Sequence, residues 1–283
     1  MLALKIAGLF VNGISIDLAR IALSYLSKFY GLDLNSQDPS VIKTEVKNAQ
    51  AIFSLSPTGI IDEQLIKAIQ TIKRCGYQDK LKLVNIEQAR QINRWDPDQP
   101  VTYFVNGYVP GLSPDEQEKI FAKAWNSWEK YSPTMRVIRT DSAQSANIII
   151  DASSSRAEEF GSVGNVLAWA QLPIGDRFRG KLLVKFDKAE NWRTTSLDAV
   201  ATHEFGHLWG LEHTNILNEL MYPIYNPDVT SPQAKYDIPQ FQLRYGAQTP
   251  PPPTADIPDI IVIVNNKRYP LGKAIESSSI ESN

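Results

Sequence analysis

The sequence contains few cysteines and histidines, no long apolar run and no excess of either charge. A single cysteine, Cys75, excludes an intrachain disulfide, so the cysteine count gives no evidence of an oxidising compartment. No apolar run approaches the length of a membrane-spanning helix, and no membrane span is expected. With 29 Lys and Arg against 31 Asp and Glu, the formal net charge is -2, which argues against nucleic acid or an anionic membrane as the main partner.

All three histidines of the chain lie in one segment, HEFGHLWGLEH. Residues four apart share one face of a helix, so His203 and His207 can present their imidazoles to one metal ion. Glu204 lies beside them and is placed to take the proton of a metal-bound water. Gly210 lets the chain leave the helix through a left-handed conformation, after which His213 supplies a third nitrogen. Three neutral nitrogens and one open position predict a catalytic zinc site and not a closed structural one.

The remaining composition is that of an ordinary globular protein, with 43% hydrophobic and 21% charged residues. A chain of 283 residues is long enough for one large or two modest domains. Apolar residues recur at helical spacing over residues 18–29, and Asp38, followed by Pro39, and Asp62 are placed as N-caps of two further helices. Three short helices within about 60 residues predict a small bundle.

The second part of the chain carries both strand and helix signals. Ser113 and Glu116 form a capping box that starts a long helix. A proline ends the strand expected at residues 166–173, which suits an edge position. Ser196 or Asp198 starts the helix that carries the histidines. Further strands are expected at residues 101–105, 136–138, 146–150 and 182–186, and a last helix at residues 237–245.

Two residues outside the histidine segment are candidate parts of the same site. Cys75 lies in a loop with the sequence KRCGYQD. A thiolate binds zinc well, so Cys75 can displace the catalytic water and hold the site latent; the alternative is an inert thiol. Met221 follows the third histidine in a tight turn and forms either an apolar floor beneath the imidazoles or ordinary core filling.

The two ends of the chain and one internal stretch carry weaker signals. Residues 1–17 begin with an apolar stretch that polar residues interrupt, so a signal peptide is not clear. Residues 81–94 are expected to be a polar linker, where activation would occur. Residues 248–283 are expected to form a proline-rich hinge and a short C-terminal tail, with a hairpin around residues 265–266.

Together these motifs resemble the matrixins, the matrix-metalloproteinase branch of the metzincin zinc endopeptidases, over roughly residues 18–253. The histidine segment, followed by Thr214, resembles the zinc signature of that family. The segment LMYPIY at residues 220–225 resembles its Met-turn and the wall of its S1′ pocket. The segment KRCGYQD resembles its cysteine switch, in which a propeptide thiolate caps the catalytic zinc, and this favours the latent interpretation of Cys75.

The resemblance implies an α+β fold with two parts. Residues 95–247 are expected to form a zincin-like (metzincin) catalytic domain with a twisted, mixed five-stranded sheet and three helices. A small three-helix, peptidoglycan-binding-like prodomain precedes it, so residues 18–80 are assigned to a helical propeptide with the cysteine switch. Arg74 and Asp79 match the salt bridge that holds the switch loop in relatives. The prolines that usually precede these two residues are absent, replaced by Lys73 and Gln78, which predicts a less rigid loop and weaker latency.

The resemblance also sets expectations for metal ions. One catalytic zinc is expected, bound by the three histidines and capped by Cys75 in the latent form. The usual structural second zinc is not expected, because two of its histidine positions hold Trp169 and Lys185. Asp187 and Glu190 match two calcium ligands of the family, but the companion loop lacks the usual acidic residue. Calcium binding and solvated acidic side chains are therefore alternatives.

The implied reaction is endoproteolysis of an extended protein or peptide substrate. Zinc polarises the scissile carbonyl, and Glu204 acts as the general base toward the attacking water. Leu167 and Ala168, in the edge strand, are expected to pair with the substrate backbone. Pro223 and Tyr225 are expected to flank an S1′ pocket for an apolar side chain.

The resemblance further implies a secreted, extracellular monomer that another protease activates. Two other functions stay open at this point. Residues 18–72 can act as a cell-wall or glycan-binding module that targets the peptidase, on the analogy of fold alone. The chain can also be a permanently latent, non-catalytic protein in which Cys75 caps the metal.

Overall fold

The computed structural model describes most of the chain. The described residues are 13–35, 38–79, 93–154, 159–193 and 195–246, together with the backbone of two strands at 260–264 and 267–271. The expected N-terminal segment as far as residue 12, and the expected linker at residues 80–92, lie outside them. Contacts divide the chain into one compact unit, Met1–Gln248, and a second, Thr249–Asn283. No helix within the described ranges is both long and apolar enough to cross a membrane.

Three helices form a bundle at the start of the first unit, namely α2 (Ile16–Tyr30), α3 (Pro39–Ile52) and α4 (Glu63–Thr71). Their N-termini are capped as the sequence predicts: Asp38 accepts from the Ser40 amide and Asp62 from the Leu65 amide. Buried side chains of the three helices form one hydrophobic cluster, which also includes Phe160 and Val166 from the second part of the unit.

A mixed sheet forms the centre of the second part. Its strands are β1 (Arg74–Cys75), β2 (Val101–Val105), β3 (Val137–Arg139), β4 (Ile148–Ser153), β5 (Val166–Ala170) and β6 (Leu182–Asp187). They lie in the order β1-β5-β6-β4-β2-β3, and β5 and β6 are antiparallel while the other pairs are parallel. The α+β class is confirmed.

The sheet has six strands, five of which, β2 to β6, lie within residues 95–247, where sequence analysis expected five. The sixth is β1, which comes from the switch loop and pairs in parallel with β5. It is two residues long, so it carries no periodicity that a sequence pattern can reveal. Its presence also means that β5 is not an edge strand here, although its sequence suits an edge.

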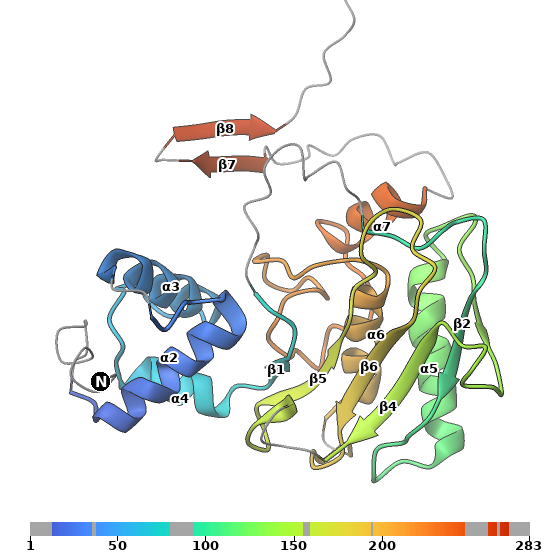
Figure 1. Ribbon diagram of the computed structural model, residues 1–283, viewed down its shortest axis with the longest axis horizontal. Helices are drawn as coiled ribbons and strands as arrows, with labels where there is room; N and C mark the ends of the chain where they lie inside the picture. The colour runs from blue at the N-terminus through green and yellow to red at the C-terminus, as the bar shows by residue number, and fades with distance from the viewer. Residues whose placement is uncertain are drawn as a thin grey trace, which may run out of the picture. The chain divides into compact units, whose positions relative to one another are not determined.

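Two long helices, α5 (Pro114–Glu129) and α6 (Leu197–Leu208), lie side by side against one face of the sheet (Figure 1). Their contact is aromatic: the Trp125 and Phe205 rings stack with centroids 3.8 Å apart. The Trp128 indole nitrogen donates to the Thr202 carbonyl at 2.8 Å. A third helix, α7 (Asp237–Tyr245), adds Phe241 and Tyr245 to the hydrophobic cluster that contains Trp125 and Phe205.

The second unit contains one antiparallel strand pair, β7 (Ile260–Val264) and β8 (Lys267–Leu271). The pairing of Val264 with Lys267 agrees with the hairpin predicted around residues 265–266, which themselves lie outside the described residues.

Candidate metal centre

The histidine segment forms the C-terminal half of α6 and the turn after it. Ser196 caps the helix, its hydroxyl accepting from the Ala199 amide, and His203 and His207 lie one turn apart on the buried side. Gly210 then adopts a φ of +90°, and a Cβ there would lie 2.2 Å from the Asn93 carbonyl oxygen. Glycine is therefore required at this position on two counts, conformation and space. The turn returns His213 to the two helical histidines.

The three imidazoles converge through their Nε2 atoms. The His213 Nε2 atom lies 3.3 Å from that of His203 and 3.2 Å from that of His207. The Cys75 Sγ atom lies 3.5 Å from His207 Nε2, and all four ligand atoms lie within 4.8 Å of one another. Tetrahedral zinc with ordinary Zn–N and Zn–S bonds places such atoms about 3.3 and 3.6 Å apart. The donor set therefore fits one tetrahedral zinc ion.

The other ring nitrogen of each histidine has an acceptor. The Nδ1 atom of His203 lies 2.6 Å from the Leu220 carbonyl oxygen, and that of His207 lies 2.7 Å from the Leu211 carbonyl oxygen. A carbonyl oxygen can only accept, so both Nδ1 atoms carry the proton and both Nε2 atoms are left with a lone pair. Burial also lowers the pKa of each histidine, that of His203 to about 3, which keeps the rings neutral as metal binding requires.

His213 differs from the other two because its Nδ1 partner is a side chain of the switch loop. Its Nδ1 atom lies 3.0 Å from Asp79 Oδ1, and both side chains are buried. Burial alone would raise the pKa of Asp79, but the Arg74 charge and the His213 hydrogen bond hold it below its usual range. The loop thus contacts the metal centre through Asp79 as well as Cys75.

Glu204 and Cys75 are both fully enclosed. Burial raises the pKa of Glu204 to about 8, and burial together with the Glu204 charge raises that of the Cys75 thiol. The Glu204 Oε2 atom has no hydrogen-bond partner within the described ranges. A buried carboxylate oxygen beside a metal site suits a proton acceptor for water.

Residues of the switch loop lie in a cleft between β5 and the segment at residues 223–225. The loop bonds to both rims. Its backbone hydrogen bonds are Arg74 N to Asn165 O at 2.8 Å, Gly76 N to Ala168 O at 2.7 Å, Cys75 N to Pro223 O at 3.0 Å, and Tyr225 N to Lys73 O at 2.9 Å. The loop therefore takes the edge of β5 at Leu167 and Ala168 that sequence analysis assigned to substrate. The Tyr77 ring packs against the metal centre, its centroid 4.5 Å from that of His207.

The Arg74–Asp79 ion pair that the resemblance implied is present, with 2.5 Å between Nη2 and Oδ1. Arg74 is fully buried, its guanidinium carbon lying 3.7 Å from the Phe29 ring centroid and another of its nitrogens donating to the Tyr25 hydroxyl. The Asp79 amide donates to the Phe29 carbonyl at 2.8 Å. Helix α2 therefore anchors the loop.

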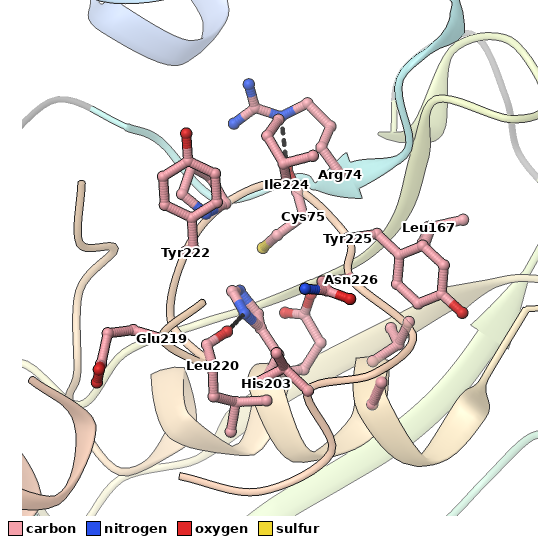
Figure 2. A pocket seen from close by; sticks show the side chains of 15 residues that line it. Arg74, Cys75, Leu167, His203, Glu219, Leu220, Tyr222, Ile224, Tyr225 and Asn226 are labelled. Carbon is pink, nitrogen blue, oxygen red and sulfur yellow. Dashed lines mark hydrogen bonds between the residues drawn. The ribbon is translucent and has the colours of Figure 1, made fainter. Parts of the chain in front are cut away.

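One pocket beside the metal centre contains most of the predicted substrate residues (Figure 2). Leu167, Pro223 and Tyr225 line it, with Ala199 and Val200 of α6, Leu220 and Val229 adding further apolar side chains. In Figure 2 the Cys75 sulfur points into the pocket toward His203, whereas the Arg74 guanidinium points away from it. Ala168 does not line the pocket and instead offers its carbonyl oxygen to the loop. The Tyr225 hydroxyl accepts from the Ser196 amide at 2.7 Å, which joins the pocket wall to the start of α6.

Comparison with known proteins identifies the family. A profile of the matrixin peptidase family matches residues 94–246. The chain belongs to the matrixin family. Among its relatives, macrophage metalloelastase of Rattus norvegicus is 29% identical over 239 residues, which are 79% of this chain and 49% of the relative. Neutrophil collagenase of Homo sapiens is 30% identical over 243 residues, 80% of this chain and 50% of the relative.

Matrilysin of Felis catus is 31% identical to this matrixin over 212 residues, which are 72% of this chain and 77% of that protein. Against the metalloelastase and collagenase, however, the matrixin chain spans about half of the relative's length. Matrixins are zinc-dependent peptidases, which agrees with the cluster of His203, His207, His213 and Cys75.

The predicted calcium residues of this matrixin lie apart from the metal centre. Asp187 ends β6, and its Oδ1 atom accepts from the Ala189 amide at 2.8 Å. Glu190 accepts from the Gly164 amide with one oxygen, and its other oxygen lies 3.3 Å from the Lys73 ammonium. Both carboxylates are buried, so the alternative of solvated acidic side chains is wrong for this form of the chain.

Trp169 and Lys185, the two residues for which sequence analysis expected no second zinc site, face each other across β5 and β6. The Lys185 ammonium lies 2.5 Å from the Glu159 carboxylate and 5.8 Å from the Trp169 ring centroid. An ion pair and a cation–π contact thus join these strands.

Several residues of the site were missed by sequence analysis. A Cβ at Gly206 would lie 2.3 Å from the Met221 sulfur, so this glycine lets Met221 pack beneath the helix. Glycine inside a helix is unfavourable by about 1 kcal/mol against alanine, and that was an available signal. Asp237 accepts from the Leu220 and Met221 amides at 2.7 and 3.1 Å and fixes the turn. Nothing in the sequence pattern marks Asp237 or Tyr77.

Proposed function

We propose that this chain is a zinc-dependent endopeptidase that is made as a latent zymogen. The observation that carries the proposal is the convergence of three Nε2 atoms and one sulfur atom at separations of 3.2 to 3.5 Å. His203, His207 and His213 would hold the ion, and Cys75 would be the fourth ligand in the latent form. Bound zinc supplies Lewis acidity toward the scissile carbonyl and makes water more acidic.

The chain's own residues supply the remaining chemistry. Glu204 takes a proton from water at a carboxylate oxygen and returns it to the leaving amine. The rims of the cleft, at Ala168 and at Pro223 and Tyr225, bind an extended peptide backbone, since the switch loop already bonds to the same groups. The pocket beside His203 takes an apolar substrate side chain.

The family and the occupied cleft support latency, secretion as a monomer, and activation by another protease. The loop covers the metal centre, the β5 edge and the pocket at once, so a substrate can enter only after the loop leaves. Residues 18–80 are proposed as the propeptide and residues 95–247 as the catalytic domain; the helical cluster of the first part also takes in Phe160 and Val166 of the second. The glycan-binding alternative gains no support, because α2 uses Tyr25 and Phe29 to hold the loop.

The test is Glu204→Ala in the zinc-loaded full chain after limited proteolysis. We expect cleavage of a generic fluorogenic peptide to fall by at least about 100-fold while zinc content stays at one per chain, because general-base catalysis contributes about 10²–10⁴-fold. Asp115→Ala, which removes an exposed carboxylate on α5, is the control. Undiminished cleavage by Glu204→Ala would refute the mechanism. No cleavage by the activated wild type, with zinc bound, would favour a non-catalytic protein.

A further inference from the structure

The side chain of Lys73 enters a polar site that the cysteine switch does not explain. Its ammonium lies 2.6 Å from the Thr195 hydroxyl and 3.3 Å from a Glu190 carboxylate oxygen. The Glu190 side chain is 2% exposed and that of Lys73 is 31% exposed, so the lysine lies over the carboxylate at the surface of the cleft. The switch loop, which occupies the cleft, therefore supplies a cation to the Glu190 carboxylate.

Glu190 is built to keep this orientation. Its second oxygen accepts from the Gly164 amide, a contact in which Lys73 takes no part. Among the ion pairs of the described residues, Glu190 takes part in the one with Lys73 alone. A buried carboxylate that loses its cation is destabilised unless another cation replaces it. When the loop departs, Glu190 therefore becomes an unpaired acceptor at the rim of the cleft.

The polar site adjoins the pocket. Thr195 directly precedes Ser196, whose amide donates to the hydroxyl of the pocket residue Tyr225. The Tyr225 amide in turn donates to the Lys73 carbonyl. Lys73 therefore contacts this rim of the cleft with its backbone and Glu190 with its side chain. A peptide that bonds to the same rim would present one of its side chains to Glu190 and Thr195.

We propose that Glu190 and Thr195 form a specificity subsite for a basic side chain, filled by Lys73 in the latent chain and by a substrate lysine or arginine in the active one. The inference rests on the proposed endopeptidase function and adds a substrate class to it: peptides with an apolar side chain in the pocket and a basic residue nearby. Two ligands could place a cation at the Glu190 carboxylate: the basic side chain of a substrate, as proposed, or a divalent metal ion, which is the competing source.

The first experiment uses the zinc-loaded full chain after limited proteolysis. A series of peptides is made from one sequence, with lysine or norleucine at one of the three positions on either side of the scissile bond. Norleucine has a similar stem and no charge. We expect lysine to raise kcat/KM about tenfold over norleucine at one position, the value of a hydrogen-bonded, partly buried charge. In Glu190→Gln this ratio should fall to about one at that position, and in Thr195→Val it should fall partway.

Equal kcat/KM for lysine and norleucine at every position would overturn the subsite. So would a lysine preference that survives in Glu190→Gln. The competing source is tested by adding calcium or magnesium chloride and measuring binding by calorimetry. The site would be a metal site if one ion bound per chain, if Glu190→Gln abolished that binding, and if the bound ion removed the lysine preference. If no peptide is cleaved, the endopeptidase proposal fails, and the second experiment still decides the cation contact.

The second experiment uses the latent, zinc-loaded full chain and needs no activity. The rate at which a thiol reagent labels Cys75 reports how often the loop opens. We expect Lys73→Met to raise that rate about tenfold and Lys73→Arg to restore it, since arginine keeps the charge. In a Glu190→Gln background, Lys73→Met should add little. Equal labelling of Lys73→Met and the wild type would overturn the proposal.

Discussion

The buried Arg74–Asp79 pair offers the sharpest test of how the loop is held. We consider Arg74→Met, which keeps the length of the side chain and removes its charge. The ion pair at 2.5 Å is lost, with the bond to Tyr25 and the contact with the Phe29 ring. Asp79 stays buried and keeps its contact with His213.

The magnitude follows from the uncompensated charge. Removing one partner of a buried ion pair destabilises by about 3–5 kcal/mol. We take the lower end, because the His213 contact remains. Since about 1.4 kcal/mol corresponds to a tenfold change in an equilibrium constant, a loss of about 3 kcal/mol raises the population of the open loop about 150-fold. The double variant Arg74→Met/Asp79→Asn should open less than Arg74→Met alone, because it leaves no buried charge unpaired.

The assay is the labelling rate of Cys75 in the zinc-loaded zymogen, in the regime where closing is faster than labelling. Arg139→Met is the matched control: the Arg139–Glu118 pair has exposures of 45% and 22% and is far from the loop, so labelling should not change. If Arg74→Met labels within about threefold of the wild type while its far-ultraviolet circular dichroism is unchanged, the anchoring argument is wrong.

Two further predictions concern stability. Gly210→Ala should lower the free energy of unfolding by about 1–3 kcal/mol more than Gly161→Ala: both have positive φ, but only Gly210 faces a carbonyl oxygen, that of Asn93 at 2.2 Å. Equal losses in urea unfolding would contradict this. Burial raises the pKa of Asp237 to about 7, so its contribution to stability is full below the unfolded pKa of about 4 and is lost as pH rises through 7. The difference in unfolding free energy between the wild type and Asp237→Asn should therefore fall by about 2–4 kcal/mol from pH 4 to 8, and a flat difference would exclude this titration.

The elements of the fold were predictable where one local interaction sets them. A cap such as Asp38 or Ser113 needs partners within four residues, and the helices it starts begin where predicted. The spacing of the three histidines is likewise local, because a helix and one glycine turn are enough to bring them together. The expected domain boundaries are not tested, since residues 80–92 lie outside the described part.

The parts that escaped prediction depend on contacts between segments far apart in the sequence. Strand β1 exists because residues 74–75 dock against β5, and no local pattern encodes that docking. The contact of Asp79 with His213 joins residues 134 positions apart. Sequence analysis treated Lys73 as the replacement of a proline and its partner Glu190 as the match of a calcium ligand. Neither comparison could show that the two side chains meet.

The contact between Lys73 and Glu190 affects how firmly the latent loop is held. A proline at the position of Lys73 would stabilise the closed loop by about 0.4–1 kcal/mol, through the lower entropy of the open one. The Lys73 ammonium gains one hydrogen bond to Thr195 and one partly exposed ion pair with Glu190, together worth about 1 kcal/mol. The two effects are of the same size, so the missing proline does not by itself make the loop easier to open. They differ in their response to salt: an ion pair that is 31% exposed on one side is screened, whereas chain entropy is not. Opening of this loop should therefore depend on ionic strength, as opening of a proline-stiffened loop would not.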